Sequence, residues 1–329
     1  MEHFNLDIVV TRGEAVESEH QVHACVVDAH DRVVSGARNA AQRTFWRSCA
    51  KPFQVMPLLA SGGFDELPWA ADELVLACAS HGGEPEHVNV AESMLQDIGR
   101  EEGDLVCGPH DPLSSRGARL VRENGIRLSR LHNNCSGKHA AMLAFAHTSG
   151  WEMDGYERAA HPVQQAASAS VARWTGVAVR ELDLAVDGCG VVVYGLSLEA
   201  MARAYARLAA AYRRGDEIPR RIVDAIRSRP HLFGGTDRFD TIMLEETDGR
   251  ILTKIGAEGV HCAALLDAGL GVAVKVADGA SRAQHPAVLR LLQRLGVLPD
   301  PLSPRLAEYL RRPVRNTRGE RVGIVAPAA

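Results

Sequence analysis

The chain has 329 residues, of which 46% are hydrophobic and 24% charged, the proportions of an ordinary globular protein. Its 37 basic and 41 acidic side chains leave a formal charge of −4, which excludes a broadly basic nucleic-acid-binding surface. No apolar run reaches the ~18–20 residues of a membrane span, and the first residues lack the pattern of a signal peptide. Seven scattered cysteines argue against a secreted disulfide framework. We therefore expect a cytoplasmic protein with neither membrane nor nucleic acid as partner.

Strand-like segments open and close the chain, and helical patterns fill its middle. In chain order, β-branched residues predict strands at residues 5–12, 20–28 and 32–35. Apolar spacing then predicts a helix from Lys51 and others at residues 72–80, 86–98, 138–147, 162–174, 197–212, 219–227 and 237–246. Strands follow at residues 250–254, 260–266 and 271–277, then a helix at 286–295 and an edge strand at 321–325.

These elements predict the α/β (α+β) class. The simplest arrangement joins the N- and C-terminal strands into one antiparallel sheet beside a helical middle at about residues 85–247. Because no linker-like stretch or internal repeat interrupts the chain, we expect a single domain covering residues 1–329.

Lysine is scarce in this sequence. Only four of the 37 basic residues are lysine, and the other 33 are arginine. A lysine amine can lose its proton and act as a base or a ligand, whereas an arginine effectively never does. Three of the four, Lys51, Lys138 and Lys254, fall in segments that resemble motifs, and we expect the fourth, Lys275, to be structural.

The first of these lysines follows a serine at the spacing Ser48-x-x-Lys51. On a helix, residues three apart lie on one face, so a neutral Lys51 could act as the base that activates the Ser48 hydroxyl. Pro52 suits the first turn of a helix, where free backbone N–H groups could stabilise an oxyanion beside Ser48. The alternative is a surface lysine on the first turn of a core helix.

Two further elements follow in the chain order found in penicillin-recognising serine enzymes. Ser80-His81-Gly82 ends a predicted helix, and Lys254-Ile255-Gly256 lies on a late predicted strand. Lys254 could pair with Ser80 as a second serine–lysine tandem. Taken alone, Ser80 could equally be a helix-terminal hydroxyl.

Two thiol-containing segments suggest a metal site. The run His132–His139 contains Cys135 and Lys138, and Cys189 lies in a glycine-flanked turn after Asp187. Two thiols that meet could hold zinc. The spacing contains no C-x-x-C pair, so two buried free cysteines are the alternative.

Five segments resemble the bacterial L-asparaginase II family of the Rhizobium type. They are residues 47–54, 79–88, 132–143, 187–202 and 254–265, in family order and at family-like spacing. The resemblance implies a fold similar to serine β-lactamases and the related glutaminases, hydrolysis of L-asparagine to L-aspartate and ammonia, and a homodimer. It also implies two catalytic tandems, Ser48 with Lys51 and Ser80 with Lys254, together with Asp187 beside the nucleophile. Cys135, Lys138 and Cys189 resemble the zinc site of the family.

A zwitterionic substrate needs partners for both of its charges. We expect Arg47 to bind the carboxylate, Asp187 or Glu258 to meet the ammonium, and His139 to support the substrate site. Glutamine differs from asparagine by one methylene, which a pocket discriminates by only ~1–3 kcal/mol. A glutaminase therefore remains an alternative. Two others are another serine–lysine amidohydrolase of this fold and a non-catalytic zinc-binding protein.

Overall fold

The structure is a computed structural model that describes residues 2–328. It divides into two compact units, each assembled from separate stretches of the chain. The first unit contains the residues up to Cys49, Leu196–Ala210, and the residues from Arg250 onward. The second contains Ala50–Gly195 and Ala211–Gly249. The single domain expected for residues 1–329 stays a prediction.

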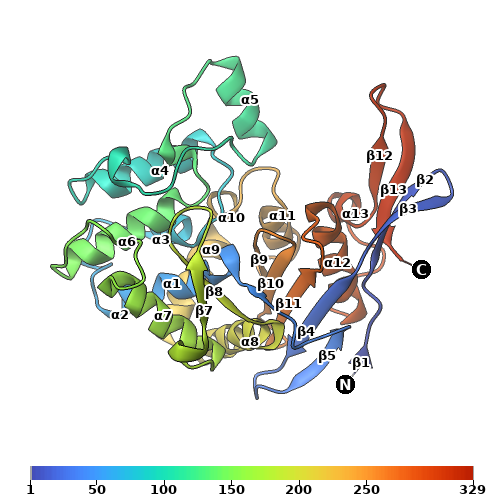
Figure 1. The fold of residues 1–329 in the computed structure, drawn as a ribbon, viewed down its shortest axis with the longest axis horizontal. Helices are drawn as coiled ribbons and strands as arrows, with labels where there is room; N and C mark the ends of the chain where they lie inside the picture. Colours follow the sequence, from blue (N-terminus) through green and yellow to red (C-terminus); the bar gives the residue numbers. More distant parts are fainter. Residues whose placement is uncertain (1, 329) are drawn as a thin grey trace. The chain divides into compact units, whose positions relative to one another are not determined.

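A six-stranded sheet forms the centre of the first unit (Figure 1). Its order is β1 (Glu2–His3), β5 (Val33–Ala37), β4 (Val22–Val27), β11 (Leu270–Val276), β10 (Val260–Leu265) and β9 (Ile251–Ile255). All neighbouring strands are antiparallel except β1 and β5, which are parallel. The predicted mixed α/β class, with one sheet combining N- and C-terminal strands, is confirmed.

A second sheet in the same unit corrects the expectation that all these strands form one sheet. Its order is β12 (Arg312–Arg315), β13 (Arg321–Pro327), β2 (Ile8–Arg12) and β3 (Ala15–His20). Most side chains of β3 are exposed, whereas every residue of β10 is buried. A strand this polar on both faces has no place in a sheet covered by helices on both sides, so it pairs at an edge.

Helices cover the six-stranded sheet. α8 (Leu198–Arg214) lies so close to β11 that a Cβ added at Gly271 would be 1.9 Å from the Ala202 carbonyl oxygen. α12 (Ser281–Arg294) contacts β10 and β11, and α13 (Pro304–Leu310) packs on α12. The predicted start of the α12 helix at Pro286 was wrong. Proline is favoured in a first turn, but here burial of Ala283 and Gln284 extends the helix five residues earlier.

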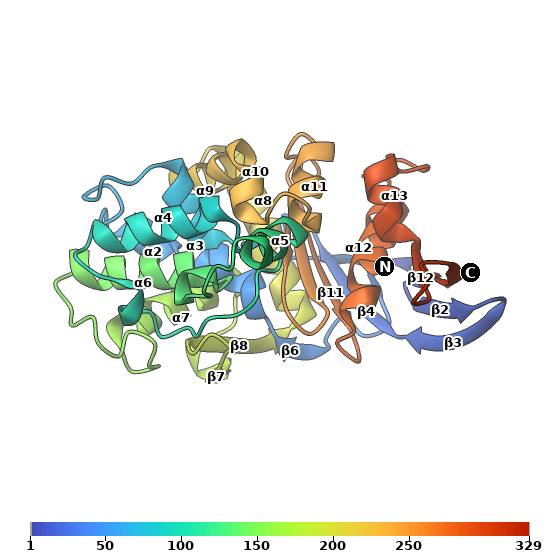
Figure 2. The ribbon, with the colours of Figure 1, turned by 90° about the horizontal axis from the view of Figure 1, so that it is seen from above.

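The second unit is mainly helical (Figure 2). Its helices are α1 (Lys51–Gln54), α2 (Met56–Ala60), α3 (Ala71–Cys78), α4 (Pro85–Gln96), α5 (Ser115–Glu123), α6 (Ser136–Thr148), α7 (Pro162–Thr175), α9 (Glu217–Ser228), α10 (Pro230–Phe233) and α11 (Phe239–Glu246). β7 (Asp183–Val186) and β8 (Val192–Ser197) form an antiparallel hairpin. The helix α6 is buried over its first eleven residues and contacts α2, α3, α4 and α7, as expected for a helix apolar on all sides.

Sequence patterns found the long buried helices but missed α5. The predicted helices at residues 72–80, 86–98, 138–147 and 162–174 correspond to α3, α4, α6 and α7 with shifted ends. α5 is an amphipathic but predominantly polar helix in which only Gly117 is buried, and the predicted elements did not include it.

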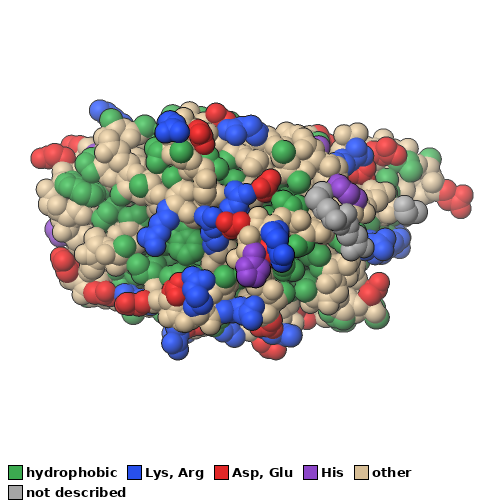
Figure 3. All heavy atoms as spheres, turned by 90° about the horizontal axis from the view of Figure 1, so that it is seen from below, with side chains coloured by type: hydrophobic (Ala, Val, Ile, Leu, Met, Phe, Trp, Pro, Cys, Tyr) green, Lys and Arg blue, Asp and Glu red, His purple; other side chains and the backbone are tan. Residues whose placement is uncertain are grey.

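The surface is a mixture of charges, and Figure 3 shows both signs interspersed on one face. All four lysines are buried, with exposed fractions of 0% to 8%. The cations at the surface are therefore arginines, as the composition suggested. Over residues 2–328, no helix combines the length and apolar character that crossing a bilayer requires.

We predict that Gly271→Ala lowers the free energy of unfolding by about 3 kcal/mol, the upper end of overpacking costs. The added Cβ would meet backbone atoms of α8, which cannot rotate away. Chemical denaturation measures the change. Gly103→Ala is the control, because its nearest new neighbour would lie at an ordinary 3.5 Å. Equal stabilities of the two variants would contradict the close packing of α8 on β11.

Candidate active site and metal centre

Ser48 lies in a helical stretch that follows one strained residue. The 3₁₀ helix η1 (Arg47–Ala50) continues directly into α1, and Arg47 before Ser48 has a left-handed φ of 53°. A non-glycine residue in this region costs energy and is common beside functional groups. Ser48 is half-buried and precedes Lys51 by three residues in helical backbone.

Lys51 is 1% exposed, which excludes the alternative of a surface lysine. Its Nζ donates to the carbonyl oxygens of Ala79 and Asn134, the latter at 3.0 Å, and lies 3.2 Å from Ser80 Oγ. Carbonyls can only accept, so two N–H groups are committed to them whatever the charge of the amine. A neutral Lys51 would therefore direct its lone pair toward the Ser80 hydroxyl and could receive a proton without rearrangement.

Ser80 reaches Lys51 because α3 ends two residues before it. Ala79 is extended, with φ −74° and ψ 155°, which turns its carbonyl and the following serine toward Nζ. Gly83 then adopts a φ of +70°, and a Cβ there would lie 3.0 Å from Pro112. The loop after Ser80 is therefore tightly packed and needs glycine at this position.

Two stacked histidines fix this loop. The rings of His81 and His87 lie 5.0 Å apart at 12°. Nδ1 of His81 accepts from the Gly83 N–H and Nδ1 of His87 accepts from the Glu84 N–H. Each Nε2 then carries the hydrogen, toward Ser136 Oγ and the His231 carbonyl respectively. Burial lowers the pKa of both rings, and the proximity of His87 lowers that of His81 further. Both are held neutral.

In the first unit, the Ser48 segment packs against the segment of Lys254. Cys49 Sγ donates to the Lys254 carbonyl oxygen at 3.0 Å. A Cβ at Gly256 would lie 3.1 Å from Cys49 Sγ, so glycine allows this approach. Lys254 itself is fully buried on β9, and its Nζ donates to the Ile255 carbonyl at 3.1 Å. Its predicted pairing with Ser80 stays a prediction.

Cys135, Lys138 and Cys189 come together in the second unit. Each is less than 9% exposed, and Lys138 Nζ lies 3.0 Å from Cys189 Sγ. The hydrogen bond with Cys135 and the charge of Lys138 outweigh burial and lower the pKa of Cys189 to about 5. The same bond, together with burial, raises the pKa of Cys135 to about 12. Burial opposes a charged Lys138, but the thiolate outweighs it and raises its pKa.

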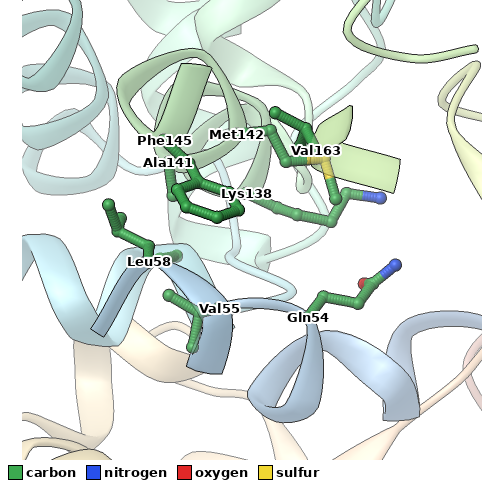
Figure 4. Close-up of a pocket in the computed structure, with 9 residues that line it drawn as sticks. Gln54, Val55, Leu58, Lys138, Ala141, Met142, Phe145 and Val163 are labelled. Carbon is green, nitrogen blue, oxygen red and sulfur yellow. The ribbon is translucent and has the colours of Figure 1, made fainter. Parts of the chain in front are cut away.

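The stem of Lys138 lines a small apolar cavity of about 10 Å³, and its amine points away from the Leu58 side (Figure 4). This volume is close to the minimum for one water molecule and far too small for an amino acid. The other lining residues are Gln54, Val55, Leu58, Ala77, Ala141, Met142, Phe145 and Val163. The residues around the cavity pack on the aliphatic stem of Lys138 and so orient its amine. The cavity is not a substrate pocket.

His139 and Asp187 lie near this cluster. His139 is fully buried, and its Nδ1 lies 2.6 Å from the Tyr156 hydroxyl. Burial, and then the charge of Lys138, lowers the pKa of His139 to about 3. Asp187 sits in the turn between β7 and β8, where its side chain accepts from the Gly188 N–H at 2.8 Å. Its charge contributes to the raised pKa of Lys138.

The remaining predicted residues belong to the first unit. Arg47 is half-buried, and Glu258 is exposed in the β9–β10 turn with a φ of 58°. Lys275 Nζ donates to the Glu258 carbonyl at 2.8 Å, and burial lowers the pKa of Lys275. Lys275 thus supports the Glu258 turn.

Sequence reasoning missed two residues beside Lys51. Asn134 lies within the predicted metal-binding run, but it contacts Lys51 through its backbone carbonyl. Because every residue has a backbone carbonyl, the residue type does not predict such a contact. His110 bonds to the Asn134 N–H at 2.9 Å from a loop without regular structure. Its segment, Gly-Pro-His-Asp-Pro, carries turn residues as its only signal.

The buried Lys51 amine lies beside the Ser80 hydroxyl, an arrangement that could activate a serine for nucleophilic attack. The model of the family described as L-asparaginase II matches residues 8–327, so the chain belongs to that family. Membership supports an asparaginase-type amidohydrolase activity. No curated protein matches the chain significantly.

Solved structures resemble the chain at low identity. The glutamate form of Mglu is 16% identical over 84% of this chain, with a TM-score of 0.39, and this chain spans 61% of the length of that one. A β-lactamase from Mycobacterium bovis is 12% identical over 84% of this chain and 95% of its own, with a TM-score of 0.37. Simvastatin synthase from Aspergillus terreus is 11% identical over 83% and 91%, with a TM-score of 0.38.

The histidine pair predicts how stability depends on pH. Each ring is neutral when folded but has an ordinary pKa when unfolded, so below about pH 6.5 the unfolded chain binds more protons. The free energy of unfolding should be at its full value above that pH. Below it, the value should fall by up to ~1.4 kcal/mol per pH unit for each ring.

Denaturant unfolding between about pH 7.5 and about pH 5.5 measures this slope. His87→Asn keeps an acceptor for the Glu84 N–H but cannot titrate, so its slope should be shallower by one proton. A wild-type stability that is constant over this range would contradict the assignment of neutral rings.

Proposed function

We propose that the protein hydrolyses L-asparagine to L-aspartate and ammonia, with Ser48 as nucleophile and Lys51 as its base. The observation that carries the proposal is the position of Lys51. Its amine is buried and bound to two carbonyls, and its third direction faces the Ser80 hydroxyl. Lys51 also follows Ser48 by three residues in helical backbone. Family membership supports the class of reaction.

In the proposed first step, Ser48 Oγ attacks the side-chain carbonyl carbon of asparagine, and its proton passes to the neutral Lys51 amine. Backbone N–H groups, that of Ser48 among them, stabilise the oxyanion. The proton then passes to the departing ammonia, which leaves an aspartyl ester on Ser48. Water hydrolyses the ester, releases aspartate and restores the serine hydroxyl.

Ser80 acts on the same proton. Its hydroxyl lies 3.2 Å from Lys51 Nζ, within reach for relaying a proton to or from the amine. In the family resemblance Lys254 is the partner of Ser80, and we retain that role as part of the proposal. Asp187 is proposed to lie beside the nucleophile.

The two charged groups of the substrate need separate partners. We propose Arg47 for the carboxylate and Asp187 or Glu258 for the ammonium, with His139 supporting the site. Glutamine is the alternative substrate, because one methylene alters binding by only ~1–3 kcal/mol.

We also propose that Cys135, Lys138 and Cys189 bind zinc. Two sulfur donors and one amine suit this ion, and the structure already places them in contact. Among residues 2–328, no group of three His, Cys, Asp or Glu side chains is arranged to hold a metal. The third donor in this proposal is Lys138, the role that the family resemblance implies. Bound zinc would supply a fixed positive charge that orders these side chains. The catalytic steps above use only the side chains of the chain.

Substitutions at Ser48 and Lys51 test the mechanism. Ser48→Ala should abolish ammonia release from asparagine. Lys51→Arg should lower kcat by about 10²–10⁴-fold, because it keeps the positive charge but cannot take up a proton. A coupled ammonia assay, run with asparagine and with glutamine, measures both.

The control is Ser18→Ala in the strand β3, which should leave kcat unchanged. Peptide mass spectrometry of acid-quenched enzyme should find the aspartyl ester on the peptide with Ser48. An ester on the Ser80 peptide, or substantial turnover by Ser48→Ala, would overturn the choice of nucleophile.

Removal of the metal should weaken substrate binding more than it slows turnover. Dialysis against a chelator, or Lys138→Met, should raise KM more than it lowers kcat, with zinc content followed by elemental analysis. Cys25→Ala, which removes a buried thiol in the strand β4, should leave the zinc content unchanged. Complete loss of turnover that only zinc restores would show instead that the metal takes part in catalysis.

A further inference from the structure

The segment of residues 108–114 joins the two loops that hold Lys51. Ser114 N donates to the Gly82 carbonyl at 3.1 Å, in the loop that carries Ser80. Asn133 Nδ2 donates to the Gly108 carbonyl at 2.6 Å, in the loop that carries Asn134. Pro112 packs against Gly83. The segment therefore sets the spacing of the loops that supply the acceptors of Lys51.

His110 is the side chain in this segment that reaches the Lys51 acceptors. Its Nε2 accepts from the Asn134 N–H at 2.9 Å, so its other nitrogen, Nδ1, carries the hydrogen and donates to the Asp111 carbonyl at 2.7 Å. Both ring nitrogens are thus used in hydrogen bonds. The side-chain amide of Asn134 also lies against the ring, 3.2 Å from Nε2.

The backbone of Asn134 is held from both sides. Its N–H is bound by His110 and its carbonyl accepts from Lys51 Nζ at 3.0 Å. His110 therefore holds the N–H of the residue whose carbonyl orients the Lys51 amine. Loss of the His110 contact would release the Asn134 N–H and allow its carbonyl to move away from Nζ.

We propose that His110 is a positioning residue for Lys51, acting through the backbone of Asn134. This inference rests on the proposed function, in which Lys51 is the base. A displaced acceptor changes the direction of the Lys51 lone pair, and misplacement of a catalytic group by about 1 Å can cost about 10²-fold in rate. The effect should fall on turnover, because His110 holds no group that we assign to binding the substrate.

The test compares two replacements of His110. His110→Leu removes the acceptor, and we expect kcat for asparagine to fall about tenfold to a hundredfold with KM within about threefold of wild type. His110→Gln places a carbonyl oxygen near the position of Nε2 and should keep kcat within about threefold of wild type. If the His110→Gln variant keeps its kcat while His110→Leu loses it, the role of His110 is positioning rather than packing.

His161→Leu is a matched control. His161 makes the same pair of bonds, accepting from the Val163 N–H at 3.2 Å and bonding to the Glu152 carbonyl at 2.7 Å, at the start of α7. It should lose similar thermal stability but keep its kcat. An unchanged kcat in His110→Leu, an equal loss in His110→Gln, or an equal loss in His161→Leu would each overturn the inference. Failure of the wild type to release ammonia from asparagine or glutamine would overturn the proposed function instead.

Discussion

The burial of the Lys51 amine is the constraint on which the second unit depends. An amine removed from water needs a partner for every N–H group, and the cost of leaving one unmet is several times the net value of a normal hydrogen bond. Two loops meet this need with backbone carbonyls from Ala79 and Asn134. Backbone acceptors do not titrate, so they hold the amine in place whether or not it carries a proton. That property suits a base, which has to change charge without moving.

The same constraint explains how the other lysines are used. Lys254 and Lys275 also donate to carbonyls of their own or neighbouring turns. Lys138 differs, because its partner is the Cys189 thiolate, which carries a charge. An arginine could satisfy a buried anion, but it could not become a neutral donor to a metal. The chain uses arginine at its surface and lysine at buried positions, where the amine donates to backbone carbonyls or to the Cys189 sulfur.

The sequence identified several buried side chains of the candidate site better than it identified their partners. The scarcity of lysine and the Ser48-x-x-Lys51 spacing pointed to Lys51, and the thiol segments pointed to Cys135 and Cys189. The family resemblance added Lys138 to the two thiols. The acceptors of Lys51 were not predictable, since any residue has a carbonyl. The second sheet was missed because the residue pattern of a strand does not identify the strand it pairs with. The helix α5 was missed because it is mostly polar and buries only Gly117. His110 was missed because it acts on a peptide N–H from a loop.

The thiol–lysine cluster balances its own charge. At neutral pH the directions of the pKa shifts leave Cys189 as a thiolate, Cys135 as a thiol and Lys138 as an ammonium. One negative and one positive charge then face each other in a buried site, which satisfies both without a metal. A cation bound by all three donors has to displace the protons of Cys135 and Lys138. The three side chains can therefore balance their charges with one another before any metal binds.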